Sequence, residues 1–367
     1  MKYKLSEICN YSIEKISVDS LNQDTYVSTE NMLPNKGGIS RAASLPSAKQ
    51  TQAFFSGDVL VSNIRPYFKK IWFAKFNGGC SNDVLVFRAK DGVSKHFLYY
   101  VLSDDAFFDY STATSKGTKM PRGDKAAIME YEVPDFTYEE QEKITAFLRS
   151  IDAKIELNSR INNHLEQVAQ ALFKERFLSR RDLPFGWQQM SLGEVSDMSA
   201  GGDKPKIISN QKTEKYQYPV YSNGISEEGL YGFTTDYKIS AESVTVSARG
   251  TIGFVCLRHI PYTPIVRLVT LVPRTNVISA KYLYLWLKNI PIHGTGTTQQ
   301  QLTVPDFRKT EIIIPPGAVM AEFTETVNPL FWQMWKNQAE NAKLADIRDT
   351  LLPRLMSGEL DVSELDI

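Results

Sequence analysis

Apolar residues recur at alternating spacings of three and four in two separate segments of the chain. The first segment covers residues 144–172 and the second covers residues 323–351. This spacing, sustained over about four heptads, is typical of a coiled-coil seam rather than of a surface helix. A helix of about 30 residues is about 45 Å long at 1.5 Å per residue. We therefore expect two long helices that pack together, and an antiparallel coiled coil is the arrangement that places a globular domain at each end.

The two seams coincide at a constant shift of 179 residues, and polar residues interrupt both at the same two places. The matching residues are Asn158, Asn162, Asn337 and Asn341. A buried asparagine in a seam costs stability but fixes the register of the helices. We interpret these four residues as register determinants. Arg348, which corresponds to Ala169, is the one further departure, and we expect it either at a frayed rim or paired with an acidic neighbour.

The segments before the two long helices also resemble each other. Each contains a strand-like apolar run that ends in Ser, at 58–62 and 243–247, and later an aromatic-rich helical stretch, at 97–102 and 282–287. Another strand-like run covers residues 264–272. Strands mixed with short helices indicate an α+β fold. We predict two similar globular domains, separated by the long helices and related by a pseudo-two-fold internal repeat.

The boundaries of these parts follow from the seams and from the Pro-Gly pair near residue 184. The predicted parts are a first globular domain at 1–140, a central helix at 141–182, a second globular domain at 183–319, a C-terminal helix at 320–356 and a tail at 357–367.

Composition narrows the class of protein. Hydrophobic residues make up 42% of the 367 residues, which is enough for folded cores. Lys and Arg together number 42, as do Asp and Glu, and this balance counts against a free-standing DNA binder unless partner subunits supply most of the phosphate contacts. The three cysteines lack metal-binding spacing, and neither a signal peptide nor a membrane span is recognisable. We expect a cytoplasmic protein that does not contact membrane.

The chain lacks the motifs of the common catalytic and cofactor sites. It contains no phosphate-binding loop, and the glycine pattern at 249–253 is a weak match to a dinucleotide site. The four histidines are scattered without metal-ligand spacing. The acidic residues between 135 and 142 fit the first turn of a helix better than a nuclease centre. We expect no catalytic centre and no bound metal or cofactor.

Each globular domain has two segments whose side chains suit DNA. In the first domain they are Asn63, Arg65, Tyr67, Lys69 and Lys70, followed by Lys116, Lys119 and Arg122. In the second domain they are Ser247, Arg249 and Thr251, followed by Thr297, Thr298, Gln299 and Gln300. Arginine can bind guanine edges, and Gln or Asn adenine edges, through two hydrogen bonds. Each residue taken alone also fits an ordinary solvated loop, but similar scaffolds with different loops predict two different short DNA sequences.

Four stretches resemble a known family. Residues 146–174 closely resemble the central helix of the specificity subunits of type I restriction-modification systems, and residues 347–360 resemble their C-terminal ending. Residues 57–70 and 246–253 resemble the strand–turn motifs of their target recognition domains. The resemblance extends over essentially the whole chain.

This resemblance implies a non-catalytic subunit that binds double-stranded DNA. Each target recognition domain would read one half of a split site, and the coiled coil would set the unread spacing. The partners would be two modification (methyltransferase) subunits carrying S-adenosylmethionine and two restriction (motor-nuclease) subunits using ATP and Mg²⁺. One departure concerns residues 315–322, which lack the Glu-Gln pair that the first half keeps at 140–141. Docking of a methyltransferase at that end is therefore left open.

Two other functions are compatible with parts of this pattern. A DNA methyltransferase or nuclease with its own recognition domains would require a cofactor domain, for which the chain has neither motif nor spare length. A structural spacer that holds two partner proteins would use the helices without any contact with DNA.

Overall fold

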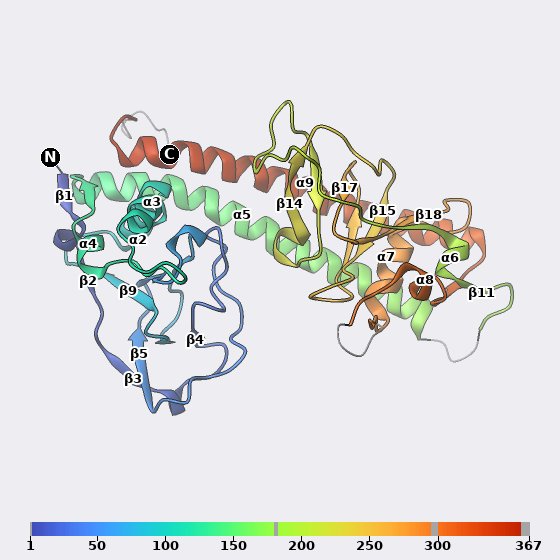
Figure 1. Cartoon of the computed structure of the whole chain (residues 1–367), viewed down its shortest axis with the longest axis horizontal. Helices are drawn as coiled ribbons and strands as arrows, with labels where there is room; N and C mark the ends of the chain where they lie inside the picture. Colours follow the sequence, from blue (N-terminus) through green and yellow to red (C-terminus); the bar gives the residue numbers. More distant parts are fainter. Residues whose placement is uncertain (1, 180–182, 295–299, 361–367) are drawn as a thin grey trace. The chain divides into compact units, whose positions relative to one another are not determined.

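The structure is a computed structural model that describes residues 2–179, 183–294 and 300–360 (Figure 1). It divides into two compact units. The first unit comprises Met1–Asn158 and Ala339–Ile367, and the second comprises Ser159–Gln338. Each unit thus contains one globular domain together with a segment of each long helix. In the described part of the chain, no helix is both long enough and apolar enough to cross a lipid bilayer.

The first globular domain is built on two four-stranded sheets. The main sheet has the order β2 (Cys9–Tyr11), β9 (Val84–Ala89), β6 (Val59–Ser62), β7 (Ile71–Phe73), and all its neighbours are antiparallel. The second sheet has the order β3 (Lys15–Ser17), β5 (Gln50–Phe54), β8 (Gly78–Cys80), β4 (Tyr26–Val27). All four residues of β6 are buried, as expected for an apolar strand at the centre of a sheet.

Short elements complete this domain. They are β1 (Lys2–Lys4) paired with β10 (Glu132–Pro134), the helices α1 (Leu5–Ile8), α2 (Lys95–Ser103), α3 (Asp105–Ala113) and α4 (Lys125–Met129), and the 3-10 turns Val18–Ser20 and Pro66–Phe68. The Ser94 side chain caps α2 by accepting a hydrogen bond from the Phe97 amide at 3.4 Å. A serine at this position satisfies an amide that the first turn of a helix leaves without a partner.

The second globular domain repeats this plan. Its main sheet has the order β12 (Ser196–Ala200), β18 (Val269–Pro273), β15 (Ser243–Val246), β16 (Val255–Arg258). The other elements are β11 (Gln188–Ser191) paired with β19 (Glu311–Ile314), the sheet β14 (Leu230–Thr234), β13 (Tyr218–Tyr221), β17 (Thr263–Pro264), the helices α6 (Leu192–Val195), α7 (Ala280–Asn289) and α8 (Val304–Phe307), and the 3-10 turn Ser226–Gly229. Ser279 caps α7 as Ser94 caps α2. The predicted α+β fold with an internal repeat is confirmed.

The two long helices are α5 (Tyr138–Phe173), which ends in the π-helical turn Lys174–Leu178, and α9 (Gly317–Met356). Each begins three residues before the start expected from the sequence. In the first unit, Ile144 and Leu148 of α5 belong to the same core cluster as Leu352 and Leu355 of α9.

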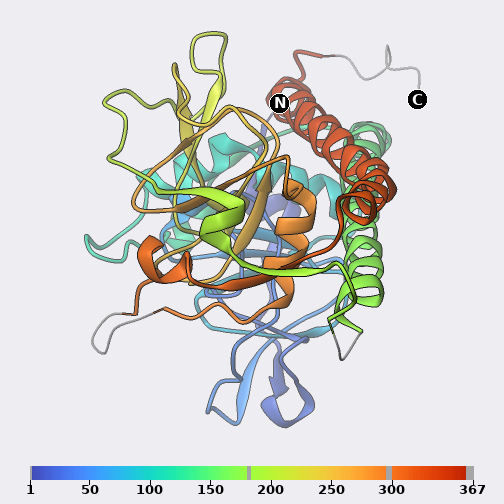
Figure 2. The ribbon, with the colours of Figure 1, turned by 90° about the vertical axis from the view of Figure 1, so that its right-hand side faces the viewer.

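Figures 1 and 2 show α5 and α9 side by side, and the contacts within each unit establish their direction. In the first unit, Asn158 donates to the Asn341 side-chain oxygen at 2.9 Å. In the second unit, Asn337 donates to the Asn162 oxygen at 2.8 Å. Residue numbers rise along one helix as they fall along the other, so the predicted antiparallel pairing is confirmed.

Each domain is joined to the helices of its own unit by a tyrosine bound to a carboxylate. In the first unit, the Tyr100 hydroxyl donates to Asp152 at 2.7 Å, and Arg348 binds the other oxygen of Asp152 at 2.9 Å. In the second unit, the Tyr284 hydroxyl donates to Glu166 at 2.6 Å, and Lys288 lies 3.2 Å from the same oxygen. Of the two environments expected for Arg348, the structure therefore gives the pairing with an acidic residue.

Candidate nucleic-acid interface

The two segments predicted to face DNA in the first domain are joined by backbone hydrogen bonds. The turn at 63–70 follows β6, and the loop at 115–123 connects α3 with α4. The Arg65 amide donates to the Pro121 carbonyl at 2.8 Å, and the Gly123 amide donates to the Asn63 carbonyl at 3.1 Å. Although about 50 residues separate them in the chain, the two segments form one surface.

Arg65 is held in an unusual backbone conformation within this surface. Its φ of 51° lies in the left-handed region, which residues other than glycine rarely adopt. One guanidinium nitrogen donates to the Lys119 carbonyl at 3.4 Å. The buried Nε has no hydrogen-bond acceptor among the described residues. Strained residues of this kind are concentrated at functional sites.

Three of the predicted cations of the first domain bind carboxylates. Lys69 lies 2.8 Å from Asp105, Arg122 lies 3.0 Å from Asp83, and Lys116 pairs with Asp124. The hydrogen bond from Lys116 lowers the pKa of Asp124. The hydrogen bond with Asp83 raises the pKa of Arg122. These pairs tie the loop to neighbouring elements, and the side chains of Lys116 and Arg122 remain more than half exposed, at 81% and 53%.

The remaining candidates of this domain differ in exposure. Tyr67 and Phe68 are 48% and 39% exposed and pack against each other, with ring centres 4.8 Å apart. Lys70 points inward and donates to the Thr29 carbonyl at 2.7 Å, and burial lowers the pKa of its amine. Asn63 is buried, and its backbone amide donates to the Asp83 backbone carbonyl at 2.8 Å. Tyr67 and Phe68 are thus accessible on this surface, whereas Lys70 and Asn63 bond within the domain.

The second domain brings its own two segments together in the same way. The turn at 247–253 follows β15, and the Leu302 amide donates to the Ala248 carbonyl at 3.0 Å. The Arg249 guanidinium donates to the Gln301 side-chain oxygen through two nitrogens, at 2.9 and 3.2 Å. The exposed arginine is therefore held by a neutral amide.

The other candidates of the second domain fall into three groups. Ser247 is buried, and its amide donates to the Phe254 carbonyl at 2.9 Å. Thr251 and Gln300 are exposed. Thr297, Thr298 and Gln299 lie outside the described residues. Ser247 therefore belongs to the scaffold, and the exposed side chains available on this surface are those of Arg249, Thr251 and Gln300.

The described residues provide little for catalysis or metal binding. Among them, no group of three or more His, Cys, Asp or Glu side chains is placed to hold a metal ion. The three cysteines are buried, and burial raises their pKa values to about 12, so their thiols stay protonated near neutral pH. What this surface offers is charge, hydrogen-bond donors and aromatic rings.

The family of the chain follows from a comparison with known protein families. Residues 1–167 and 184–323 each match the family described as type I restriction modification DNA specificity domain. The chain belongs to this family. Its members are the non-catalytic subunits that bind DNA and assemble type I restriction-modification complexes, in which partner subunits carry the enzymatic activity.

Individual specificity subunits align over most of the chain. The MjaIX specificity subunit of Methanocaldococcus jannaschii is 27% identical over 75% of this chain and 71% of that protein. The HindI specificity subunit of Haemophilus influenzae is 26% identical over 98% of this chain and 99% of that protein. The crystal structure of a type I S subunit from M. genitalium covers 97% of this chain and 96% of its own, with a TM-score of 0.54 and 17% identity. This structure has the same fold.

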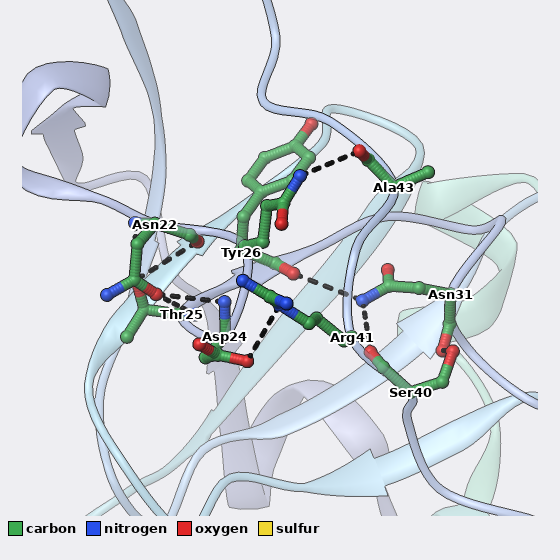
Figure 3. Close-up of polar contacts among 9 residues, drawn as sticks. Asn22, Asp24, Thr25, Tyr26, Asn31, Ser40, Arg41 and Ala43 are labelled. Carbon is green, nitrogen blue, oxygen red and sulfur yellow. Dashed lines mark hydrogen bonds and ion pairs between the residues drawn. The ribbon is translucent and has the colours of Figure 1, made fainter.

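A third loop lies beside the two candidate DNA-facing segments of this specificity subunit's first domain, and it was not predicted from the sequence. Asn31, 5% exposed, organises the loop that follows β4, because its side-chain nitrogen donates to the carbonyls of Tyr26 at 3.1 Å and Ser40 at 2.7 Å (Figure 3). Arg41, which follows Ser40 in the chain, pairs with Asp24 at 3.3 Å (Figure 3). The loop reaches the 63–70 turn through the Lys36 amide, which donates to the Lys69 carbonyl at 2.8 Å.

A lysine-rich loop of the second domain was overlooked as well. Between β12 and β13 lie the exposed residues Lys204, Lys206, Lys212 and Lys215. Lys204 donates to the Tyr231 hydroxyl at 2.6 Å and lies 4.7 Å from the centre of that ring. Four lysines between residues 204 and 215 were the available signal, and cations next to aromatic rings are typical of nucleic-acid surfaces.

Proposed function

We propose that this chain recognises a bipartite site in double-stranded DNA, with one half read by each domain. The observation that carries the proposal is the repeated placement of two segments beside the end of a central strand, at β6 and at β15, with different chemistry in each domain. The first domain presents arginine, lysine and aromatic side chains there, and the second presents arginine, threonine and glutamine. Two similar scaffolds with different side chains suit two different half-sites.

The paired helices support the second part of the proposal, which is a fixed unread spacing between the half-sites. The asparagine pairs Asn158–Asn341 and Asn162–Asn337 would fix the register of α5 against α9. A shift by one heptad would separate both pairs. The spacing would then be a property of the helices rather than of the reading loops.

The partners proposed for this chain follow from its family. Two modification subunits carrying S-adenosylmethionine and two restriction subunits using ATP and Mg²⁺ would assemble on it in the cytoplasm. The balanced charge of the chain suits such a complex, because partner subunits would supply many of the phosphate contacts.

The proposal is tested by replacing residues 116–122 with Gly and Ser in the full chain, produced together with its modification subunits. Methylated sites are then mapped across a genome. We expect the first half-site to become degenerate and the second to persist, because the replacement removes Lys116, Lys119 and Arg122 from one domain only.

A matched control is Lys143→Ala, which removes an exposed cation on α5 that pairs with Glu139. This variant should leave the methylated motif unchanged. A structural spacer without DNA contacts would predict no effect of the loop replacement, so an unaltered motif in the folded loop variant would refute the proposal.

A further inference from the structure

A tight turn at 265–268 in the second domain has a backbone that its sequence disfavours. Val266 and Arg267 have φ values of 53° and 60°, and the Leu268 amide closes the turn on the Ile265 carbonyl at 3.1 Å. Two consecutive residues in the left-handed region are usually Asn and Gly. A β-branched residue such as valine is a genuine outlier there. The surrounding structure must therefore impose this conformation.

Three hydrogen bonds with neighbouring loops impose it. The amides of Val266 and Arg267 donate to the carbonyls of Gly202 and Gly201, at 2.9 and 2.8 Å. The Asn223 side-chain nitrogen donates to the Val266 carbonyl at 2.6 Å. Gly201 is required for this approach, since a Cβ on it would lie 2.7 Å from the Ile265 carbonyl oxygen. These three hydrogen bonds, which we call the clamp, hold the turn from the side of Gly201–Gly202 and from the side of Asn223.

The clamp directs two side chains outward. Ile265 and Leu268 are almost fully buried, at 0% and 3% exposure, whereas Val266 is 46% exposed and Arg267 is also exposed. No carboxylate pairs with Arg267 among the residues that the structure describes. The turn therefore presents the Arg267 guanidinium at the surface, on a backbone held by hydrogen bonds to neighbouring loops.

The same clamp links this turn to the candidate interface. The Asn223 side-chain oxygen accepts from the Ala248 amide at 2.7 Å, so one amide group holds both the 265–268 turn and the turn that carries Arg249. The Nζ of Lys238 lies so near Gly202 that an added Cβ would come within 3.2 Å of it. Arg249 and Arg267 thus lie on turns that Asn223 connects. The Lys238 amine lies close to Gly202, which binds the 265–268 turn.

The corresponding turn of the first domain is different. It connects β8 with β9, as the 265–268 turn connects β17 with β18, and it is closed by the Val84 amide on the Ser81 carbonyl at 3.0 Å. It carries the exposed Asn82 and the half-buried Asp83, which pairs with Arg122. An element that keeps its place but changes its side chains between the domains behaves as a specificity element should.

We propose that the 265–268 turn is a base-reading element of the second domain, in which Arg267 binds the edge of a guanine in the major groove. This inference rests on the proposed reading of DNA by the second domain. Guanine presents two acceptors, O6 and N7, that match the two parallel N–H groups of a guanidinium. A side chain on a rigid turn loses little freedom on binding, which favours discrimination between bases.

The test compares Arg267→Lys and Arg267→Ala in the full chain with its modification subunits, again by mapping methylated sites. Lysine keeps the charge but lacks the bidentate fork. We expect one guanine of the second half-site to become degenerate in both variants, with discrimination at that position reduced on the order of 10- to 100-fold. The first half-site should persist. Lys309→Ala, an exposed cation of the same unit, is the control and should leave the motif intact.

Three results would overturn the inference. They are an unchanged motif in both variants, a uniform loss of methylation at both half-sites, and loss of the motif in Arg267→Ala alone. Loss in Arg267→Ala alone would indicate a phosphate contact, for which a lysine suffices. The proposed function is judged separately on the unsubstituted chain: if that chain directs methylation to no bipartite motif, the reading of DNA by two domains is wrong irrespective of Arg267. Thermal unfolding of each variant verifies that it folds.

Discussion

Asn337 lies in the apolar seam of the second unit with 4% of its surface exposed, and its polar atoms are nevertheless bonded. Its nitrogen donates to Asn162 at 2.8 Å, and its oxygen accepts from Gln333 at 2.7 Å. Asn162 in turn donates to the Met334 carbonyl at 3.0 Å. A leucine at either place would bury more apolar surface, so the pair favours one register at the expense of stability.

This arrangement predicts strong coupling between Asn162 and Asn337. Asn162→Leu alone leaves a buried donor of Asn337 without its acceptor and should lower the free energy of unfolding by about 1–3 kcal/mol. Asn162→Leu together with Asn337→Leu should recover most of that loss or exceed the original stability, because both polar groups are gone. Urea unfolding of the four chains of a double-mutant cycle measures the coupling. Additive effects would contradict the pairing.

At the scale of single residues, the sequence predicted the seam asparagines but not the ion pairs of the candidate site. The four seam asparagines were predictable because a heptad pattern fixes which positions face the partner helix. The ion pairs of the candidate site were not, since Lys69 and Arg122 meet acids from α3 and from the β8–β9 turn. Pairs brought together by tertiary folding leave no trace in local spacing. The functional value of Arg122 therefore cannot be read from its charge alone.

At the scale of elements, the last turns of α9 complete the core of the first domain. Leu352 and Leu355 are 3% and 1% exposed and belong to one cluster with Phe107 and Val59, although more than half the chain lies between them. The amphipathic pattern of residues 323–351 predicted the helix, but it did not predict that the end of the helix packs into the core of the first domain. Periodicity likewise predicted one strand over 264–272, whereas the structure divides it by the 265–268 turn, because hydrophobicity carries no information about a positive φ.

The role of α9 in that core predicts a distant effect on stability. Leu355→Ala should destabilise the first unit by about 2–5 kcal/mol, the usual range for removing a buried leucine side chain. Ile347→Ala is the matched control on the same helix, because Ile347 is 46% exposed, and its effect should stay within about 0.5 kcal/mol. Urea midpoints of the full chain compare the two. Equal effects would mean that the end of α9 does not belong to this core.

At the scale of the whole molecule, the internal repeat made most of the fold predictable. Matching strand runs, aromatic helices and heptads in both halves predicted two similar α+β domains and an antiparallel helix pair. The order of strands within the sheets was beyond the sequence, because it depends on non-local pairing such as β2 with β9 and β12 with β18. The positions of the loops that differ between the domains could be predicted from the sequence, but the contacts of their side chains could be predicted only in part.

The central claim is that two different domains read two half-sites at a spacing set by the helix pair. The most direct measurement inserts one heptad into α5 between Asn158 and Asn162 and another into α9 between Asn337 and Asn341, and maps the sites methylated with the modification subunits. Seven residues lengthen a helix by about 10.5 Å, which is the rise of about three base pairs. We predict that both half-sites keep their sequences and that the unread gap grows by up to about three base pairs. A gap that stays the same while both half-sites are still methylated would contradict the account.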